Sequence, residues 1–172
     1  ASDWRSNVLA FSDNTDLENG LKFKSMYVNK SQPERAAAVI VRENYYGFTY
    51  IPTGAIELNG KQYMHYMYWE VGTTVRADQN YSSLYCSEDY GQTWSSCRGK
   101  ISFDTDSYFA MIGYAKKPGD EYCYMLGAQS GRGYRKSSAK LARFKYDDIL
   151  NKNEYEFWNG GKRQWVKSKE SM

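Results

Sequence analysis

Histidine and cysteine are scarce in this sequence, which limits the chemistry that it can support. Its 172 residues include one histidine, His65, and three cysteines, Cys86, Cys97 and Cys123. The cysteine spacing fits no zinc site, and a single histidine leaves no second one for a relay to a nucleophile. We therefore expect no metal centre, no cofactor and no catalytic cysteine.

The odd number of cysteines leaves at least one thiol free or bonded to another chain. Cys86 and Cys97 flank a predicted hairpin, so a disulfide between them is geometrically possible. Such a bridge would persist in a secreted protein and not in a reducing cytosol.

Long apolar runs are also missing. The longest candidate, Ala-Ala-Ala-Val-Ile-Val at residues 36–41, has the length of a strand, whereas a membrane helix needs about 18–20 apolar residues. No signal-peptide pattern is visible, although Ala1 could be the first residue of a processed chain. The 23 basic and 20 acidic residues are well mixed, which argues against a nucleic-acid partner. With 41% hydrophobic residues, the chain is also not disordered overall.

Aromatic residues are abundant instead. The chain has 17 tyrosines, 7 phenylalanines and 5 tryptophans, more than its leucine, isoleucine and valine residues together. A helical bundle would rest on leucine and alanine at a period of 3.6, whereas aromatic residues favour strands. The composition predicts an all-β protein with amphipathic aromatic surface, which suits sugars or protein partners.

The chain predicts a series of short strands separated by turn residues. We expect one propeller-like domain over residues 1–165, a polar tail over 166–172, and one short helical turn at 147–150. Predicted strands cover residues 6–12, 23–28, 37–42, 80–86, 108–115, 122–127 and 139–145.

The strongest local signal is Asn59-Gly60, which lies between apolar segments at 55–58 and 61–64. These two residues tolerate the positive φ angles of a type I′ turn and predict a tight hairpin. In the second arm, residues 63–69, both alternating faces are aromatic or methionine. We expect this strand to be covered on both faces, as in stacked sheets or propeller blades.

Residues 87–94 carry the pattern Ser-x-Asp-x-Gly-x-Thr-Trp, known as an Asp box. In such a turn the carboxylate accepts backbone N–H groups, glycine takes a left-handed conformation and tryptophan anchors the turn to the sheet. We expect a structural role and not a catalytic one for these residues, which are Ser87, Asp89, Gly91, Thr93 and Trp94.

An ordered series of motifs runs along the whole chain. It includes Trp4-Arg5-Ser6-Asn7-Val8-Leu9, Ile51-Pro52-Thr53-Gly54, Asn59 to Met67, Asp78-x-Asn80-Tyr81-Ser82, the Asp box, Phe109-x-Met111, Gly131-Arg132, and Ala142-Arg143 through to Tyr155-x-Phe157-Trp158. Together these segments resemble the domain-of-unknown-function 4185 family, which includes the endo-D-arabinanases of glycoside hydrolase family 183. The resemblance covers residues ~4 to ~165.

The resemblance implies part of a five-bladed β-propeller that acts on, or binds, arabinofuranose-containing polysaccharide. This chain matches roughly the middle half of a full-length member, about two and a half blades, and lacks the family's N-terminal acidic motif. We therefore expect another polypeptide or copy to complete the propeller, because open blade edges need cover.

The same resemblance implies a set of substrate-binding residues, while the catalytic residues stay unknown. The acidic side chains at the expected cleft and near the N-terminus, namely Asp78, Asp3, Asp13 and Asp16, have no evident partner for glycoside hydrolysis, which needs two carboxylates. The motif-matched substrate-binding candidates are Trp4, Arg5, Thr53, Asp78, Asn80, Tyr81 and Arg132.

Three functions stay open from the sequence. The first is a glycoside hydrolase or a part of one, the second a non-catalytic glycan-binding or adhesion module, and the third a self-assembling structural protein built from propeller pieces. We expect the chain to lie outside the cell or at the cell surface, with a polysaccharide or glycan as partner and without a membrane span.

Overall fold

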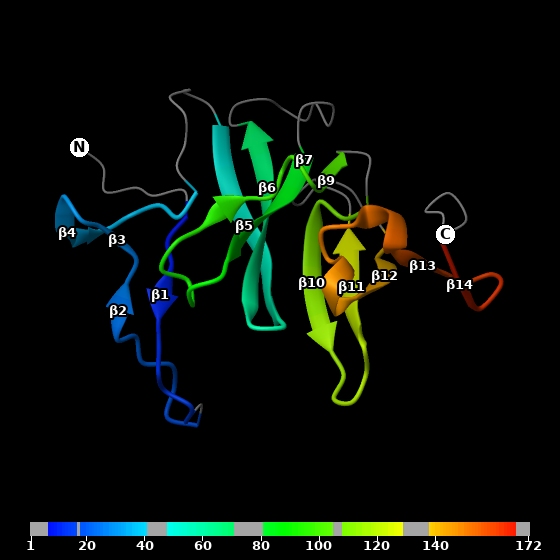
Figure 1. The fold of residues 1–172 in the computed structure, drawn as a ribbon, viewed down its shortest axis with the longest axis horizontal. Coiled ribbons are helices and arrows are strands. Elements are labelled where there is room, and N and C mark those ends of the chain that lie inside the picture. Colours follow the sequence, from blue (N-terminus) through cyan, green and yellow to red (C-terminus); the bar gives the residue numbers. More distant parts are fainter. Residues whose placement is uncertain are drawn as a thin grey trace. The chain divides into compact units, whose positions relative to one another are not determined.

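The computed structural model describes residues 7–16, 18–40, 48–70, 81–104, 108–128 and 138–167. The chain divides into two compact units, Ala1–Tyr46 and Gly47–Met172, which we describe separately. The regular structure of the described residues is antiparallel strand, apart from two 3-10 helices, η2 (Tyr146–Asp148) and η3 (Lys152–Glu154) (Figure 1). This confirms the predicted all-β class, whereas the propeller and its blade number stay predictions. The described part of the chain holds no helix with the length and apolarity to cross a membrane.

The first unit contains two short hairpins, one formed by β1 and β2 and the other by β3 and β4. The strands predicted over residues 6–12 and 23–28 are thus shorter than expected. The bounds are β1 (Ala10–Phe11), β2 (Ser25–Met26), β3 (Val28–Asn29) and β4 (Gln32–Ala36).

The strand predicted over residues 37–42 is wrong for its described part. Strand structure ends at Ala36, residues 37–40 have none, and 41–42 lie outside the described residues. The side chain of Asn7 takes the place of a neighbouring strand, because its Nδ2 donates to the Ile40 carbonyl at 3.3 Å and its Oδ1 accepts the Ile40 N–H at 3.0 Å. The backbone of the buried Ile40 is therefore satisfied without a ladder.

The second unit consists of two antiparallel sheets, which stand next to each other in Figure 1. The first follows the order β5-β6-β7-β8, with β9 also paired to β7; the second follows β10-β11-β12-β13-β14. Their bounds are β5 (Phe48–Leu58), β6 (Lys61–Glu70), β7 (Tyr81–Ser87), β8 (Ser95–Ser96), β9 (Ser102–Asp104), β10 (Met111–Lys116), β11 (Tyr122–Ala128), β12 (Lys140–Lys145), β13 (Glu156–Asn159) and β14 (Gln164–Val166).

The predicted Asn59-Gly60 hairpin joins β5 to β6. Both residues have positive φ, 51° and 79°, as a type I′ turn requires. The Gly60 N–H donates to the carboxylate of Glu57 at 2.7 Å, and the Asn59 side chain donates to Asp147 at 2.7 Å. The turn therefore fixes the register of the two longest strands of the structure and ties it to η2.

One aromatic core lies between the two sheets. Phe103 of β9 lies 6.2 Å from Tyr155, which stacks on Phe144 of β12 at 4.4 Å. The sheets approach closely at Gly54, where an added Cβ would lie 2.7 Å from Cδ1 and 3.0 Å from the carbonyl oxygen of Ile112. A larger residue there would require Ile112 to shift, because β5 and β10 lie side by side at this point.

Strand β6 is covered on both faces, as its sequence predicts. Its central residues, 63–67, are all buried. The His65 ring faces Phe103 and Tyr114 in the intersheet core, at 5.6 and 6.3 Å. The Tyr66 ring faces the other side of its sheet.

Two further boundaries differ from the sequence prediction. The strand predicted over 108–115 begins at Met111, because the preceding residues form a turn whose Phe109 carbonyl accepts a bond from Ser82 Oγ at 3.0 Å. The helical turn predicted at 147–150 is η2, which begins one residue earlier. Of the predicted tail, Val166 belongs to β14, Lys167 pairs with Glu154, and residues 168–172 lie outside the described part.

Acid should destabilise the second unit through His65. Its ring is fully buried, and neither nitrogen has a hydrogen-bond partner among the described residues. Burial lowers the pKa of His65 from 6.5 to about 3, so between these values the unfolded chain binds a proton that the folded chain excludes. The free energy of unfolding should fall as the pH drops below 6.5, by roughly 1 kcal/mol per pH unit down to about pH 3.

Denaturant unfolding across this pH range tests the effect against His65→Phe. The variant keeps a ring in the same space, next to Phe103 and Tyr114, but cannot titrate. Its stability should change less with pH than that of the wild type, and equally steep profiles would contradict the assignment to His65.

Candidate functional site

Of the seven predicted substrate-binding residues, the structure describes two, Thr53 and Tyr81. They lie on β5 and β7, on either side of β6. Thr53 sits at the register shift of β5, where its hydroxyl donates to the His65 carbonyl at 3.5 Å. The other five, Trp4, Arg5, Asp78, Asn80 and Arg132, lie outside the described residues.

Tyr81 belongs to a group of tyrosines on one face of sheet β5–β8, here called the tyrosine face. Strand pairing places them together, because residues that face each other across a ladder point to the same side. Neighbouring rings lie between 5.0 and 6.2 Å apart, mostly edge to face. The members are Tyr50, Tyr66, Tyr68, Tyr81 and Tyr85.

Tyr66 is the centre of this face. Its side chain is 1% exposed, and its hydroxyl takes part in hydrogen bonds with Tyr81 and Ser83. Burial first, and the neighbouring Tyr81 second, raise the pKa of Tyr66 well above 10. The hydroxyl therefore keeps its proton at neutral pH.

At one edge of the tyrosine face, two charged residues, Arg98 and Asp104, are neighbours of Tyr81. The Tyr68 ring stacks on Tyr81 at 5.0 Å, and the Arg98 guanidinium carbon lies 4.0 Å from the Tyr81 ring centroid. Asp104 faces Tyr81 in the ladder between β7 and β9. Both Arg98 and Asp104 are exposed. We call these four residues the Tyr81 cluster.

The Tyr81 cluster offers the groups that recognise hydroxyl-rich ligands. A guanidinium presents several N–H donors in a fixed plane, a carboxylate accepts hydrogen bonds, and tyrosine adds an apolar ring with a polar tip. The sequence predicted Tyr81 as a binding residue and did not predict Arg98 or Asp104. For Asp104 the missing signal was the pairing of β9 with β7, which brings residues 23 positions apart to one edge.

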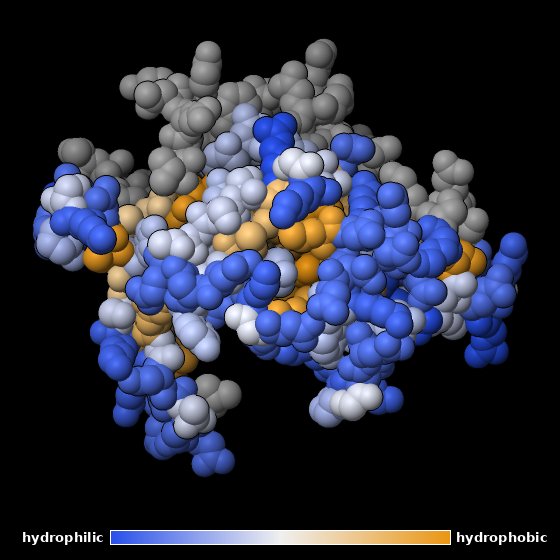
Figure 2. Space-filling view, in the orientation of Figure 1, coloured by the Kyte–Doolittle hydropathy of each residue, from blue (hydrophilic) through white to orange (hydrophobic). Residues whose placement is uncertain are grey.

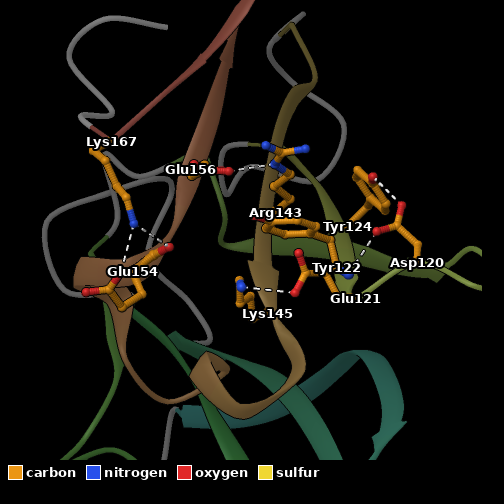
Figure 3. Close-up of polar contacts among 9 residues, drawn as sticks. All are labelled: Asp120, Glu121, Tyr122, Tyr124, Arg143, Lys145, Glu154, Glu156 and Lys167. Atoms are coloured by element: carbon orange, nitrogen blue, oxygen red, sulfur yellow. Dashed lines mark hydrogen bonds and ion pairs between the residues drawn. The ribbon is translucent and has the colours of Figure 1, made fainter.

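A second polar network covers the outer face of sheet β10–β14 (Figure 3). The Arg143 guanidinium lies 4.1 Å from the Tyr122 ring and 4.3 Å from the Trp165 ring, while its Nε donates to Glu156 at 2.6 Å. Trp165 in turn lies edge to face against Trp158 at 5.4 Å. These contacts connect four adjacent strands, β11, β12, β13 and β14, so we interpret them as structural.

The carboxylates of the described residues are held in their charged form wherever their pKa is shifted. The Tyr124 hydroxyl donates to Asp120 at 2.7 Å and lowers its pKa (Figure 3). The bond from Gly60 and the bond from Lys116 lower the pKa of Glu57, and the bond from Lys167 lowers that of Glu154. A general acid for glycoside cleavage needs the opposite shift. These groups therefore suit structure better than acid catalysis.

The turn of residues 87–94 is closed by its own side chains. Asp89 accepts the Thr93 N–H at 2.8 Å, the Thr93 hydroxyl at 2.6 Å and the Ser87 hydroxyl at 2.8 Å. Gly91 has φ 85°, and the Trp94 ring donates to its carbonyl at 3.0 Å. The carboxylate is thus committed to the turn, while the identification of the turn as an Asp box stays a prediction.

The three cysteines are free thiols. Cys86 lies in β7 and Cys97 follows β8, so the two that were predicted to flank a hairpin do so. Their bridge stays a prediction at this point. Among the described residues, no three metal-ligating side chains come together.

Comparison with protein families adds one finding. A family model described as a domain of unknown function, DUF4185, matches residues 1–171. The match spans both units and includes the whole Tyr81 cluster. No curated protein matches the chain.

Replacing Asp89 should loosen the 87–94 turn. The Thr93 hydroxyl, the Thr93 N–H and the Ser87 hydroxyl lower the pKa of Asp89 from 3.8 to about 2, so its contribution is present above pH 3.8 and is lost as the pH falls toward 2. Asp89→Ala should lower the thermal midpoint by a few degrees at neutral pH. Glu88→Gln is the matched control, because Glu88 lies in the same turn and its substitution removes only a surface ion pair with Lys61 of β6. Equal midpoints for the two variants would contradict the role of Asp89.

Proposed function

The chain belongs to the DUF4185 family, as its motifs predict, and from this membership we propose that it binds arabinofuranose-containing polysaccharide. The family match along the chain carries the proposal, and the Tyr81 cluster supplies the place. The kinship with family 183 endo-D-arabinanases, an extracellular or cell-surface location, and a position in the middle half of a longer member are parts of the same proposal.

A propeller architecture is consistent with how the two sheets pack. Each sheet is an antiparallel series of neighbouring strands, and the first strands of the two sheets, β5 and β10, approach at Gly54. In a propeller, successive blades pack face to face with their inner strands around a central axis. We propose that the two sheets are blades of a five-bladed propeller and that the 87–94 turn is its Asp box.

The Tyr81 cluster recognises sugar hydroxyls in this proposal. Arg98 donates hydrogen bonds and Asp104 accepts them, while the stacked pair of Tyr68 and Tyr81 fixes the position of the guanidinium. Asn80 directly precedes Tyr81, so the motif-matched Asp78 and Asn80 belong to the same stretch of chain. Trp4, Arg5, Thr53 and Arg132 remain binding residues by resemblance alone.

Binding is favoured over hydrolysis by the charges of the described residues. Cleavage of a glycosidic bond needs a protonated carboxyl on one side and a carboxylate on the other. The described carboxyls with shifted pKa values are shifted downward and bonded to turns or cations. Hydrolysis is therefore the second candidate.

Assembly with another polypeptide or copy is a separate proposal, carried by the first unit. Large apolar side chains are exposed on and around its hairpins, which is unusual for a surface without a partner. Phe23 is 60% exposed and Leu21 56%, and Figure 2 shows apolar residues among the polar surface of the molecule. The others are Val8, Met26 and Val28. We infer that this surface packs against a second copy.

Arg98→Ala should weaken polysaccharide binding about tenfold, which corresponds to the loss of one or two hydrogen bonds. Titration calorimetry with arabinan and arabinogalactan oligosaccharides measures it. Lys100→Ala is the matched control, because it removes an exposed cation two residues away and should leave the affinity unchanged.

The same samples separate the candidate functions. Binding without release of reducing ends supports a binding module, and release of oligosaccharides supports hydrolysis. If no arabinose-containing glycan binds, the proposed function fails. If glycans bind equally to the wild type and Arg98→Ala, the function stands and the assigned site is wrong.

Phe23→Ser should weaken self-assembly. Sedimentation velocity over a range of concentrations should show a concentration-dependent larger species for the wild type, reduced in Phe23→Ser and retained in Lys22→Ser. A wild type that stays monomeric at every concentration would contradict assembly with a second copy.

A further inference from the structure

The three thiols differ in how far solvent reaches them. Cys86 is half-buried, whereas Cys97 is 3% exposed and Cys123 is fully buried. Cys123 lies on β11 in the second sheet, where its thiol donates to the Tyr124 carbonyl at 3.8 Å. The side chains of Cys86 and Cys97, in contrast, are neighbours, and the Cys86 thiol, after burial, raises the pKa of Cys97. The odd count of cysteines thus resolves into one neighbouring pair and one isolated thiol.

The backbone brings this pair together. Cys86 faces Ser95 in the ladder between β7 and β8, and the N–H of Cys97 donates to the Leu84 carbonyl at 2.8 Å, which keeps the chain against β7 beyond the end of β8. Around Ser95, the Cys86 Sγ lies 3.6 Å from its Oγ and the Cys97 Sγ 3.9 Å from its carbonyl oxygen. Both sulfurs therefore lie on one side of the hairpin, next to the same serine.

The loop between the two cysteines is held by its own bonds. Asp89 fixes Thr93, and the Trp94 ring is bonded to Gly91. A disulfide needs its two ends at a specific separation, and a strained bridge is easily reduced. Because the turn holds β7 and β8 in register, the two cysteines stay diagonal neighbours on one side of the hairpin in the reduced protein.

We propose that Cys86 and Cys97 form an intrachain disulfide by thiol–disulfide exchange with a small disulfide such as oxidised glutathione, and that Cys86 reacts first. The Cys86 thiolate attacks one sulfur of the small disulfide and forms a mixed disulfide with it, while the S–S bond breaks and the other sulfur leaves as a glutathione thiolate. The Cys97 thiolate then attacks the sulfur of Cys86 and displaces the second glutathione. In total the protein loses two thiol protons and two electrons, and one oxidised glutathione becomes two reduced ones.

The order of the two steps follows from access and acidity. Burial and the neighbouring Cys86 thiol raise the pKa of Cys97 to about 12, and burial raises that of Cys123 to about 12. The thiolate is the attacking species, so a buried thiol with a raised pKa reacts slowly with a dissolved disulfide. Cys97 can still complete the second step, because Cys86 lies beside it on the same side of the hairpin. Cys123 has no such partner and stays reduced.

The bridge would tie the 87–94 turn to the core. Cys97 belongs to the buried cluster between the sheets, and Cys86 packs against that cluster. Closing a loop removes conformational freedom from the unfolded chain and stabilises the folded one. This inference does not depend on the proposed glycan binding, since it uses none of the ligand contacts of the Tyr81 cluster.

Intact-mass spectrometry and thiol counting of the whole protein, with and without oxidised glutathione, test the proposal. The wild type should become lighter by two hydrogen atoms, keep one free thiol, and yield a peptide that links Cys86 to Cys97. Its thermal midpoint should rise by about 5 °C over that of the reduced protein. A wild type that keeps three thiols, or that retains a glutathione on Cys86, would overturn the proposal.

Single substitutions establish the order of the steps. Cys97→Ser should stop with one glutathione on Cys86, and Cys86→Ser should keep its two remaining thiols. Cys123→Ser is the matched control and should form the bridge as the wild type does. Circular dichroism of each variant confirms that it is folded, and addition of glutathione to Cys97 in folded Cys86→Ser would contradict the order.

Discussion

The contact between the two sheets of the second unit is the constraint on which the rest depends. At Gly54 the first strand of one sheet meets Ile112 in the first strand of the other so closely that an added methyl group would require Ile112 to shift. Beyond that point an aromatic core fills the space between the sheets, and in it Phe144 stacks on Tyr155. Because this core occupies one face of sheet β5–β8, the tyrosines must take the other, where their hydroxyls and the charges at the edge come within reach of a ligand.

The sequence predicted what depends on neighbours along the chain. Asn59-Gly60 predicted the hairpin, and the aromatic and methionine residues on both faces of 63–69 predicted that β6 is covered on both sides. Both signals depend only on neighbouring residues in the chain. It failed where a distant group decides the outcome. Asn7 replaces a strand at Ile40, and β9 delivers Asp104 to Tyr81 across a register that no local pattern reveals. Of the Tyr81 cluster, the sequence therefore predicted Tyr81 alone as a binding residue, and the position of Asp104 required the strand pairing.

The charged groups of the second unit serve two different purposes. Pairs such as Arg143 with Glu156 are enclosed by aromatic rings and join adjacent strands. Arg98 also lies on an aromatic ring but is exposed, so its donors face water or a ligand. This difference in surroundings, and not the residue type, separates the structural arginine from the one that we propose to contact sugars.

The edge-to-face pair of Trp158 and Trp165 has an optical consequence. Two indole rings at 5.4 Å and 65° are close enough for their transitions to couple, which gives a paired signal in circular dichroism that isolated indoles lack. The pair spans β13 and β14, at the outer edge of its sheet. Separation of this last strand from the sheet would erase the coupled signal while the intersheet core stayed intact. The protein thus carries an intrinsic spectroscopic reporter for the order of its edge strand.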